Sequence, residues 1–145
     1  MAAFAELDDN NIVIRVCNAD QVAIDENGGD QSDSAAQQFK SLIPFTFNGV
    51  KWMQCSESGA FRGRMPGVGD TYDETEDAFI APKPFSSWVL DSNFEWVAPV
   101  TRPNETDVYR FTRWDEINLR WLASDARDTK QYYWNPDTSS FVEIV

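Results

Sequence analysis

The sequence repeats one pattern three times, as Tyr72-Asp-Glu-Thr-Glu-Asp-Ala-Phe79, Trp114-Asp-Glu-Ile-Asn-Leu-Arg-Trp121 and Trp134-Asn-Pro-Asp-Thr-Ser-Ser-Phe141. Each stretch places two aromatic residues seven positions apart, with an Asp or Asn directly after the first. This pattern predicts a strand, a tight polar turn and a second strand, because an Asp or Asn side chain can close a turn by bonding backbone amides. The two aromatics then lie near each other across the hairpin. The stretch from Trp88 to Trp96 is a looser fourth copy with a spacing of eight.

Hairpins this small are marginally stable alone in water, so we expect them to stack on one another, on the N-terminal part or on a partner. Two interpretations of the aromatics stay open: they fill small cores, or some point outward as anchors for a partner or for sugar rings. Trp and Tyr are common anchors because they bury a large area at a small entropy cost. The candidate partner-interface residues are Tyr72, Phe79, Trp88, Trp96, Trp114, Trp121, Trp134 and Phe141.

The N-terminal part shows a different pattern. Residues 4–7 and 12–17 are β-prone runs around a turn rich in Asp and Asn, which predicts a hairpin. Two further strands are expected at residues 51–56 and 60–62. A glycine-rich bend follows at 66–69.

One helix is expected, over about residues 34–42. Ser32 or Asp33 supplies the N-cap, and Pro44 ends the helix. Its spacing places three apolar side chains on one face, those of Ala35, Phe39 and Leu42.

These elements predict an α+β fold in which β-structure dominates. Residues 1–65 are expected to form an N-terminal strand and helix unit, and residues 66–145 a series of antiparallel β-hairpins. A chain of 145 residues can bury a core without metals or disulfides.

Charge limits the possible partners. The chain has 24 acidic and 12 basic residues, a net charge of −12. Such a surface is repelled by phosphate backbones and anionic membranes, so we expect no nucleic acid and no membrane as partners. No apolar run is long enough to span a membrane, and the N-terminus lacks the basic and apolar regions of a signal peptide. Synthesis in a host cytoplasm is therefore expected.

The sequence contains no histidine. Ser-His-Asp and Cys-His catalysis and His-ligated metals are excluded on that ground, so we expect a protein that is not an enzyme and uses no cofactor or metal. A hydrolase of envelope sugars, with Asp8 and Asp9 or Glu74 and Glu76 as acid and base, is the alternative of another class. The polar run 25–30 has few of the oxygen ligands of a calcium loop, and a loop preceding a helix is the preferred interpretation.

The two cysteines, Cys17 and Cys55, fall in predicted strands. Buried free thiols are expected in a protein made in a cytoplasm, although a bridge between the two stays open.

Several motifs resemble a small family of virion structural proteins of tailed phages, mainly marine and cyanobacterial phages. The resemblance rests on Gly67-Val-Gly-Asp-Thr-Tyr-Asp73, on Asp77-Ala-Phe-Ile-Ala-Pro-Lys-Pro-Phe-Ser-Ser-Trp88 and on the run from Leu90 to Pro99. The opening Phe4-Ala-Glu-Leu-Asp-Asp-Asn-Asn-Ile-Val13, the loop at Asp25-Glu-Asn-Gly28 and the closing Arg113-Trp-Asp-Glu116 are also similar. Residues 104–112 and 123–133 depart from it, where shorter links are expected.

The resemblance implies a virion structural protein. The net charge favours the exterior of the particle, because DNA packed inside a capsid repels an acidic subunit. We therefore expect a decoration or cement protein on the outer head surface, present in many copies or as a homo-oligomer. Its first expected partner is the major capsid protein and its second a tail protein. A tail-fibre, baseplate or adaptor component, with glycan binding through the Trp hairpins, is the alternative.

Overall fold

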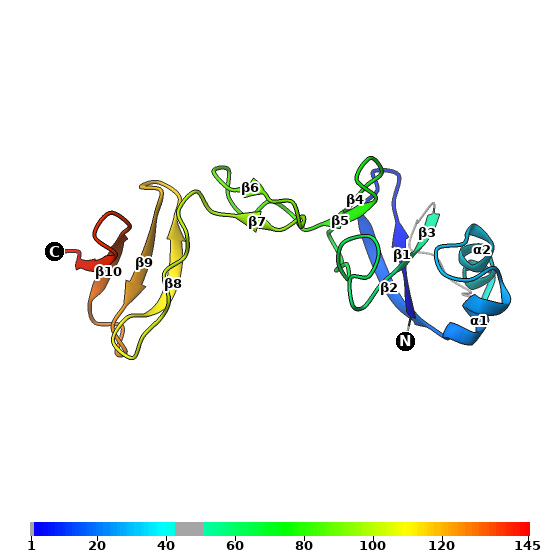
Figure 1. Ribbon diagram of the computed structural model, residues 1–145, viewed down its shortest axis with the longest axis horizontal. Helices are drawn as coiled ribbons and strands as arrows, with labels where there is room; N and C mark the ends of the chain where they lie inside the picture. Colours follow the sequence, from blue (N-terminus) through cyan, green and yellow to red (C-terminus); the bar gives the residue numbers. More distant parts are fainter. Residues whose placement is uncertain (1, 43–50) are drawn as a thin grey trace. The chain divides into compact units, whose positions relative to one another are not determined.

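The computed structural model describes residues 2–42 and 51–145 (Figure 1). The chain divides into two compact units. Unit 1 comprises Met1–Pro82 and Ser92–Glu95, and unit 2 comprises Lys83–Asp91 and Trp96–Val145. The division after Pro82 differs from the boundary at residue 65 expected from sequence, because the first aromatic hairpin packs into the core of unit 1.

Unit 1 contains a three-stranded antiparallel sheet with strand order β2-β1-β3. Its strands are β1 (Ala2–Leu7), β2 (Val13–Ala19) and β3 (Lys51–Cys55). All residues of the central strand β1 are buried, since it has a neighbour on each edge and is covered on both faces. The strands predicted at 4–7, 12–17 and 51–56 are confirmed within one or two residues at each end.

Two hydrophobic clusters lie on opposite faces of this sheet, because successive side chains of β1 alternate between the faces. Ala3, Ala5 and Leu7 belong to the first cluster, together with Tyr72 and Phe79. The second cluster contains the two apolar side chains that β1 places on the other face and the residues that cover them: Ala2, Phe4, Ile24, Ala35, Ala36 and Trp52.

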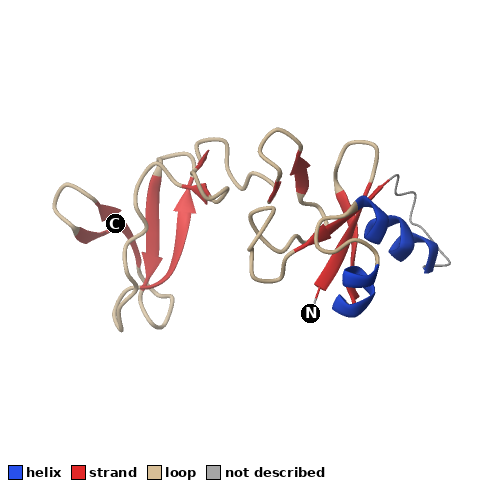
Figure 2. Cartoon of the chain, turned by 45° about the vertical axis from the view of Figure 1, so that its right-hand side comes forward, coloured by secondary structure: helices blue, strands red, loops and turns tan. Residues whose placement is uncertain are grey.

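Two helices cover the second face of the sheet (Figure 2). The helix α2 (Asp33–Leu42) confirms the predicted one, and Ser32 Oγ caps it by accepting a bond of 2.9 Å from the Ala35 amide. The helix α1 (Gln21–Glu26), capped by Asp20, was not predicted. Ala35 and Phe39 pack inward as expected, but Leu42 is 66% exposed, so its assignment to the packed face was wrong. The predicted stop at Pro44 lies outside the described residues.

A hairpin of β4 (Thr71–Asp73) and β5 (Ala78–Ile80) completes unit 1. It is joined to the residue just before β2 by a bridge between Ile12 and Thr71. Residues 60–62, predicted as a strand, form bends instead. Arg62 has a φ of 56°, and its guanidinium bonds Gln54 O and Asp77, so this segment is held by side-chain bonds rather than by a strand ladder.

Unit 2 is built on a four-stranded antiparallel meander with strand order β11-β10-β9-β8. Its strands are β8 (Arg110–Asp115), β9 (Arg120–Ser124), β10 (Gln131–Asn135) and β11 (Ser140–Glu143). A two-stranded ribbon of β6 (Val89–Leu90) and β7 (Trp96–Val97) precedes it. The predicted α+β class with dominant β-structure and successive antiparallel hairpins is confirmed.

The register of the three strict repeats confirms the predicted cross-strand aromatic pairs. Tyr72 lies opposite Phe79, Trp114 opposite Trp121 and Trp134 opposite Phe141. Their ring centroids are 5.4, 5.3 and 5.0 Å apart, respectively. The fourth copy is different, since Leu90 rather than Trp88 lies opposite Trp96. The extra residue in that copy lengthens the loop and shifts the register, so the prediction of a Trp88–Trp96 pair was wrong.

The three strict repeats also share one turn. The Asp or Asn after the first aromatic accepts backbone amide bonds within the turn, as predicted: Asp73 from Thr75 at 2.9 Å, Asp115 from Asn118 at 3.3 Å and Asn135 from Asp137 at 3.0 Å. The last loop residue of each has a left-handed backbone, with φ of 49° at Asp77, 50° at Leu119 and 49° at Ser139. A shared local sequence thus produces a shared turn, although none of the three left-handed positions is a glycine.

Candidate functional site

Seven of the eight aromatic residues predicted as interface candidates fall into three environments, and Trp96 lies outside them. Tyr72 and Phe79 are 8% and 0% exposed and fill the core of unit 1. The Tyr72 hydroxyl donates a 2.5 Å bond to Asp77 Oδ1. This bond, with Arg62 beside it, holds the pKa of the Asp77 carboxyl below its usual value. These two aromatics stabilise the fold and do not reach the surface.

Trp88, Trp114 and Trp121 form a second environment, a three-ring cluster in unit 2. The ring centroids of Trp88 lie 6.3 and 6.0 Å from those of Trp114 and Trp121. Trp114 and Trp121 are 8% and 5% exposed. Trp96 lies apart from the cluster, half-buried on β7, with the Lys83 ammonium 5.4 Å from its ring centroid.

Glu116 joins this cluster to the segment before β6. It accepts bonds of 2.9 and 2.7 Å from the Ser87 amide and hydroxyl, and one of 2.7 Å from the Trp114 indole. Ser87 and Trp114 hold the pKa of the Glu116 carboxyl below its usual value. The Glu116 carboxylate, in the turn after β8, therefore holds the Trp114 indole in place through a hydrogen bond.

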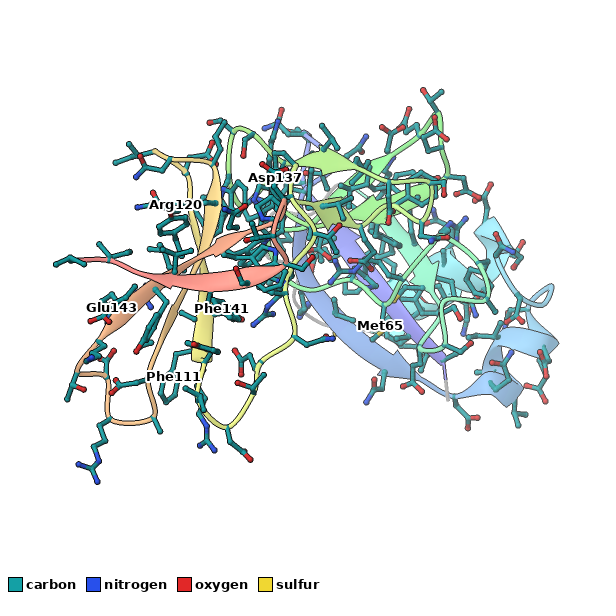
Figure 3. The ribbon with its side chains drawn as sticks, turned by 60° about the vertical axis from the view of Figure 1, so that its left-hand side comes forward. Met65, Phe111, Arg120, Asp137, Phe141 and Glu143 are labelled. Carbon is teal, nitrogen blue, oxygen red and sulfur yellow. The ribbon has the colours of Figure 1, made fainter. Side chains whose placement is uncertain are left out.

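The third environment is a groove of about 1010 Å³ in unit 2. Three half-buried aromatic side chains line it in one continuous strip, and two of them, Trp134 and Phe141, were predicted candidates. The third, Tyr109, stacks on Phe141 with ring centroids 4.5 Å apart. Figure 3 shows Phe141 on β11, with Asp137 at the turn before this strand. We define this as the aromatic groove.

Residues 99–104 form another part of the lining and are held in place by bonds to the sheet. The Trp121 indole donates a 2.7 Å bond to Val100 O. The Arg102 guanidinium donates to Thr112 Oγ1 at 2.8 Å and lies 5.5 Å from the Trp121 ring centroid. Pro103 is buried. The groove is therefore shaped before any ligand arrives.

The polar lining of the groove is almost uncharged. Among the described residues, Arg102 is the one charged side chain in the lining, and no carboxylate belongs to it. Arg102 is itself engaged, with Glu105 3.5 Å away. The side chains of Thr101, Asn104 and Ser139 line the groove and make no hydrogen bond within the described part of the chain. The groove thus offers neutral hydroxyl and amide groups beside three aromatic rings.

Tyr109 and Asn104 were not predicted as site residues. They lie in residues 104–112, where the resemblance to phage virion proteins predicts a shorter link. An aromatic residue directly before a β-prone run was the one signal that could have indicated Tyr109. Its contact with Phe141 joins segments 32 positions apart and has no local signature.

Two of the acidic residues considered for hydrolysis have structural partners, Asp8 in a turn and Glu74 in an ion pair. Asp8 Oδ1 accepts bonds of 2.8 and 2.9 Å from the amides of Asn10 and Ile12. Glu74 pairs with Lys51 at 2.9 Å, and this bond is the main cause of a lowered pKa of the Glu74 carboxyl. A general acid at neutral pH needs a raised pKa instead.

The run 25–30 forms the end of α1 and a turn. Asp30 accepts bonds of 2.9 and 2.8 Å from the side-chain amides of Gln21 and Gln54, which lower its carboxyl pKa. No cluster of three or more Cys, Asp or Glu suited to a metal ion occurs in residues 2–42 and 51–145.

The two cysteines are free thiols on opposite faces of the unit 1 sheet. Cys17 packs against the second hydrophobic cluster and Cys55 belongs to the first. Burial raises the pKa of the Cys55 thiol to about 11. A bridge would have to pass through the sheet, so the geometry supports the expected free thiols.

Comparisons with protein-family models, with curated proteins and with solved structures give no match to this chain. Within the described residues, both helices are too short and too polar to cross a bilayer.

Proposed function

We propose that this protein is a non-enzymatic structural subunit on the exterior of a tailed-phage particle. The preferred role is decoration or cement on the outer head surface, with the major capsid protein as the first partner. The motifs that resemble phage virion proteins support this proposal, as does the net charge of −12, which disfavours a position against packed DNA.

The observation that carries the proposal is the exposure of large apolar side chains in the turn between β8 and β9 of unit 2. Ile117 is 92% exposed and Leu119 is 48% exposed in this turn, and Phe111, at the opposite end of β8, is 58% exposed. Figure 3 shows Phe111 near one end of β8, an edge strand of the sheet. Ile117 and Leu119 thus expose two large apolar side chains in one turn, as on a surface that a protein partner covers.

Unit 2 has a smaller buried hydrophobic core than unit 1. Both buried hydrophobic clusters of the described residues belong to unit 1. Unit 2 depends on its cross-strand aromatic pairs and its Trp cluster for stability. Contact with a neighbouring subunit would stabilise it further.

The test compares incorporation of variants into purified particles of the phage that encodes the chain. Ile117→Asp places a charge on the proposed contact surface and is expected to reduce the copies per particle at least tenfold. Val22→Asp is the matched control, because Val22 is 60% exposed in unit 1 and an Asp is favourable in the first turn of a helix.

Equal incorporation of both variants would contradict the proposal, as would absence of the wild-type chain from purified particles. Incorporation of only a few copies per particle would instead support the tail-fibre, baseplate or adaptor role.

A further inference from the structure

We propose that the aromatic groove of unit 2 binds a neutral oligosaccharide, with hexose rings on Trp134 and sugar hydroxyls on Asn104, Thr101 and Ser139. This is a second binding function, separate from the contact surface on the β8–β9 hairpin. A subunit can occupy a particle with or without it, so the two proposals fail independently.

The aromatic strip fits the apolar faces of sugar rings. Tyr109, Phe141 and Trp134 contact each other in sequence, with centroid distances of 4.5 and 5.0 Å. All three are only half-buried, so ring surface stays open to the groove. The C–H groups on one face of a hexose carry partial positive charge and pack well against the negative face of an aromatic ring.

The polar groups suit sugar hydroxyls. A hydroxyl both donates and accepts hydrogen bonds, and so do the side chains of Asn104, Thr101 and Ser139. None of these side chains has a hydrogen-bond partner among the described residues, so each is available to a ligand. A ligand site with an apolar surface and a few convergent polar groups has the composition expected of a small-molecule site.

Charge selects a neutral glycan. A cationic ligand finds no carboxylate in the groove lining. An anionic ligand finds only Arg102, which Thr112 and Glu105 already occupy, on a chain with a net charge of −12. A proline-rich peptide also packs on aromatic rings, but its prolines offer carbonyl acceptors and no N–H donor, so the acceptor oxygen of the Asn104 side chain would stay without a partner.

The groove is also prepared for binding. Its wall at residues 99–103 is held by the Trp121 bond to Val100 O and contains two prolines, Pro99 and Pro103. A wall that is already ordered loses little conformational entropy when a ligand binds.

The experiment is an NMR titration of the full-length ¹⁵N-labelled chain. The probes are maltohexaose, cellohexaose, mannohexaose and chitohexaose, with oligogalacturonate as an anionic probe and a proline decapeptide as a peptide probe. The Trp134 indole N–H signal is assigned by its loss in Trp134→Phe. At least one neutral hexamer is expected to shift this signal in a saturable manner.

Variants then locate the site. Trp134→Ala is expected to weaken binding by about tenfold, the effect of losing one aromatic contact. Asn104→Ala is expected to weaken it by about threefold, and this exposed position keeps the fold intact. Phe111→Ala, which removes an exposed aromatic outside the groove, is expected to leave affinity unchanged.

Three results would overturn the proposal. The first is failure of all four neutral hexamers to shift the Trp134 signal. The second is saturable binding of oligogalacturonate or of the proline decapeptide in their place. The third is glycan binding that Asn104→Ala and Trp134→Ala leave unchanged.

Discussion

Removal of Trp121 tests whether the aromatic pairs hold unit 2 together. The Trp121 side chain is 5% exposed and contacts the rings of Trp88 and Trp114 at 6.0 and 5.3 Å. Its indole also donates the 2.7 Å bond to Val100 O. Burying a Trp removes roughly 200 Å² from water, which at about 25 cal/mol per Å² corresponds to about 5 kcal/mol.

Residual structure in the unfolded chain lowers this figure by about a quarter, while the lost hydrogen bond adds about 1 kcal/mol. Trp121→Ala should therefore lower the free energy of unfolding of unit 2 by about 3–5 kcal/mol, within the usual range for Trp→Ala in a core. Such a loss is comparable to the whole stability of a small domain. Unit 2 should unfold in the variant at room temperature or slightly above it.

The assay combines urea unfolding, followed by circular dichroism, with thiol labelling as a reporter of unit 1. Cys55 is 0% exposed in unit 1 and should stay protected from a maleimide when unit 2 unfolds. Phe111→Ala is the control in the same unit, and its exposed position predicts a change within about 0.5 kcal/mol. The reasoning is refuted if Trp121→Ala costs less than about 1 kcal/mol, or if Cys55 loses its protection together with unit 2.

Three other predictions concern separate features. In the wild type at pH 7.5, a maleimide should label Cys17 well before Cys55, because burial raises the pKa of the Cys55 thiol to about 11. Mass spectrometry under non-reducing conditions should find no disulfide between the two cysteines. Equal labelling rates of the two thiols would contradict this prediction. Leu119→Gly should be more stable than Leu119→Ala by about 1 kcal/mol in urea unfolding, because the φ of 50° at this position strains any residue with a Cβ. The opposite order would show that the backbone at residue 119 is not left-handed. The pKa of the Asp115 carboxyl lies below its usual 3.8, chiefly through Asn118, so its stabilisation is present above that pH and is lost as the pH falls through the lowered pKa. Asp115→Asn keeps the turn cap, as Asn135 does in the third repeat. Its melting temperature should therefore fall less between pH 6 and pH 3 than that of the wild type. An equal fall would exclude the Asp115 carboxylate as a source of the pH-dependent stability.

The hairpins could be predicted from sequence because their causes are local. An Asp or Asn one position after the first aromatic caps the turn, and a four-residue loop sets the aromatics opposite each other. The same reasoning failed at Trp88 and Trp96, where one additional residue changes the register. It also missed α1, which has six residues and only one buried side chain, that of Ile24.

Contacts between segments distant in the sequence could not be predicted from the sequence pattern. The pairing of β1 with β3 joins Ala3 to Cys55, and nothing in either run indicates the other. The aromatic groove has the same origin, because it combines residues 99–109 with the β10–β11 hairpin. Sequence identified Trp134 and Phe141 as candidates, but the side chains that complete the groove come from a connector without a periodic pattern.

Electron cryomicroscopy of intact particles tests the central proposal most directly. We expect density for this chain on the outer surface of the head, repeated with the capsid lattice, with the hairpin that carries Ile117 against the major capsid protein. Density for the chain inside the capsid, or an outer surface on which the chain is missing from both head and tail, would contradict the account.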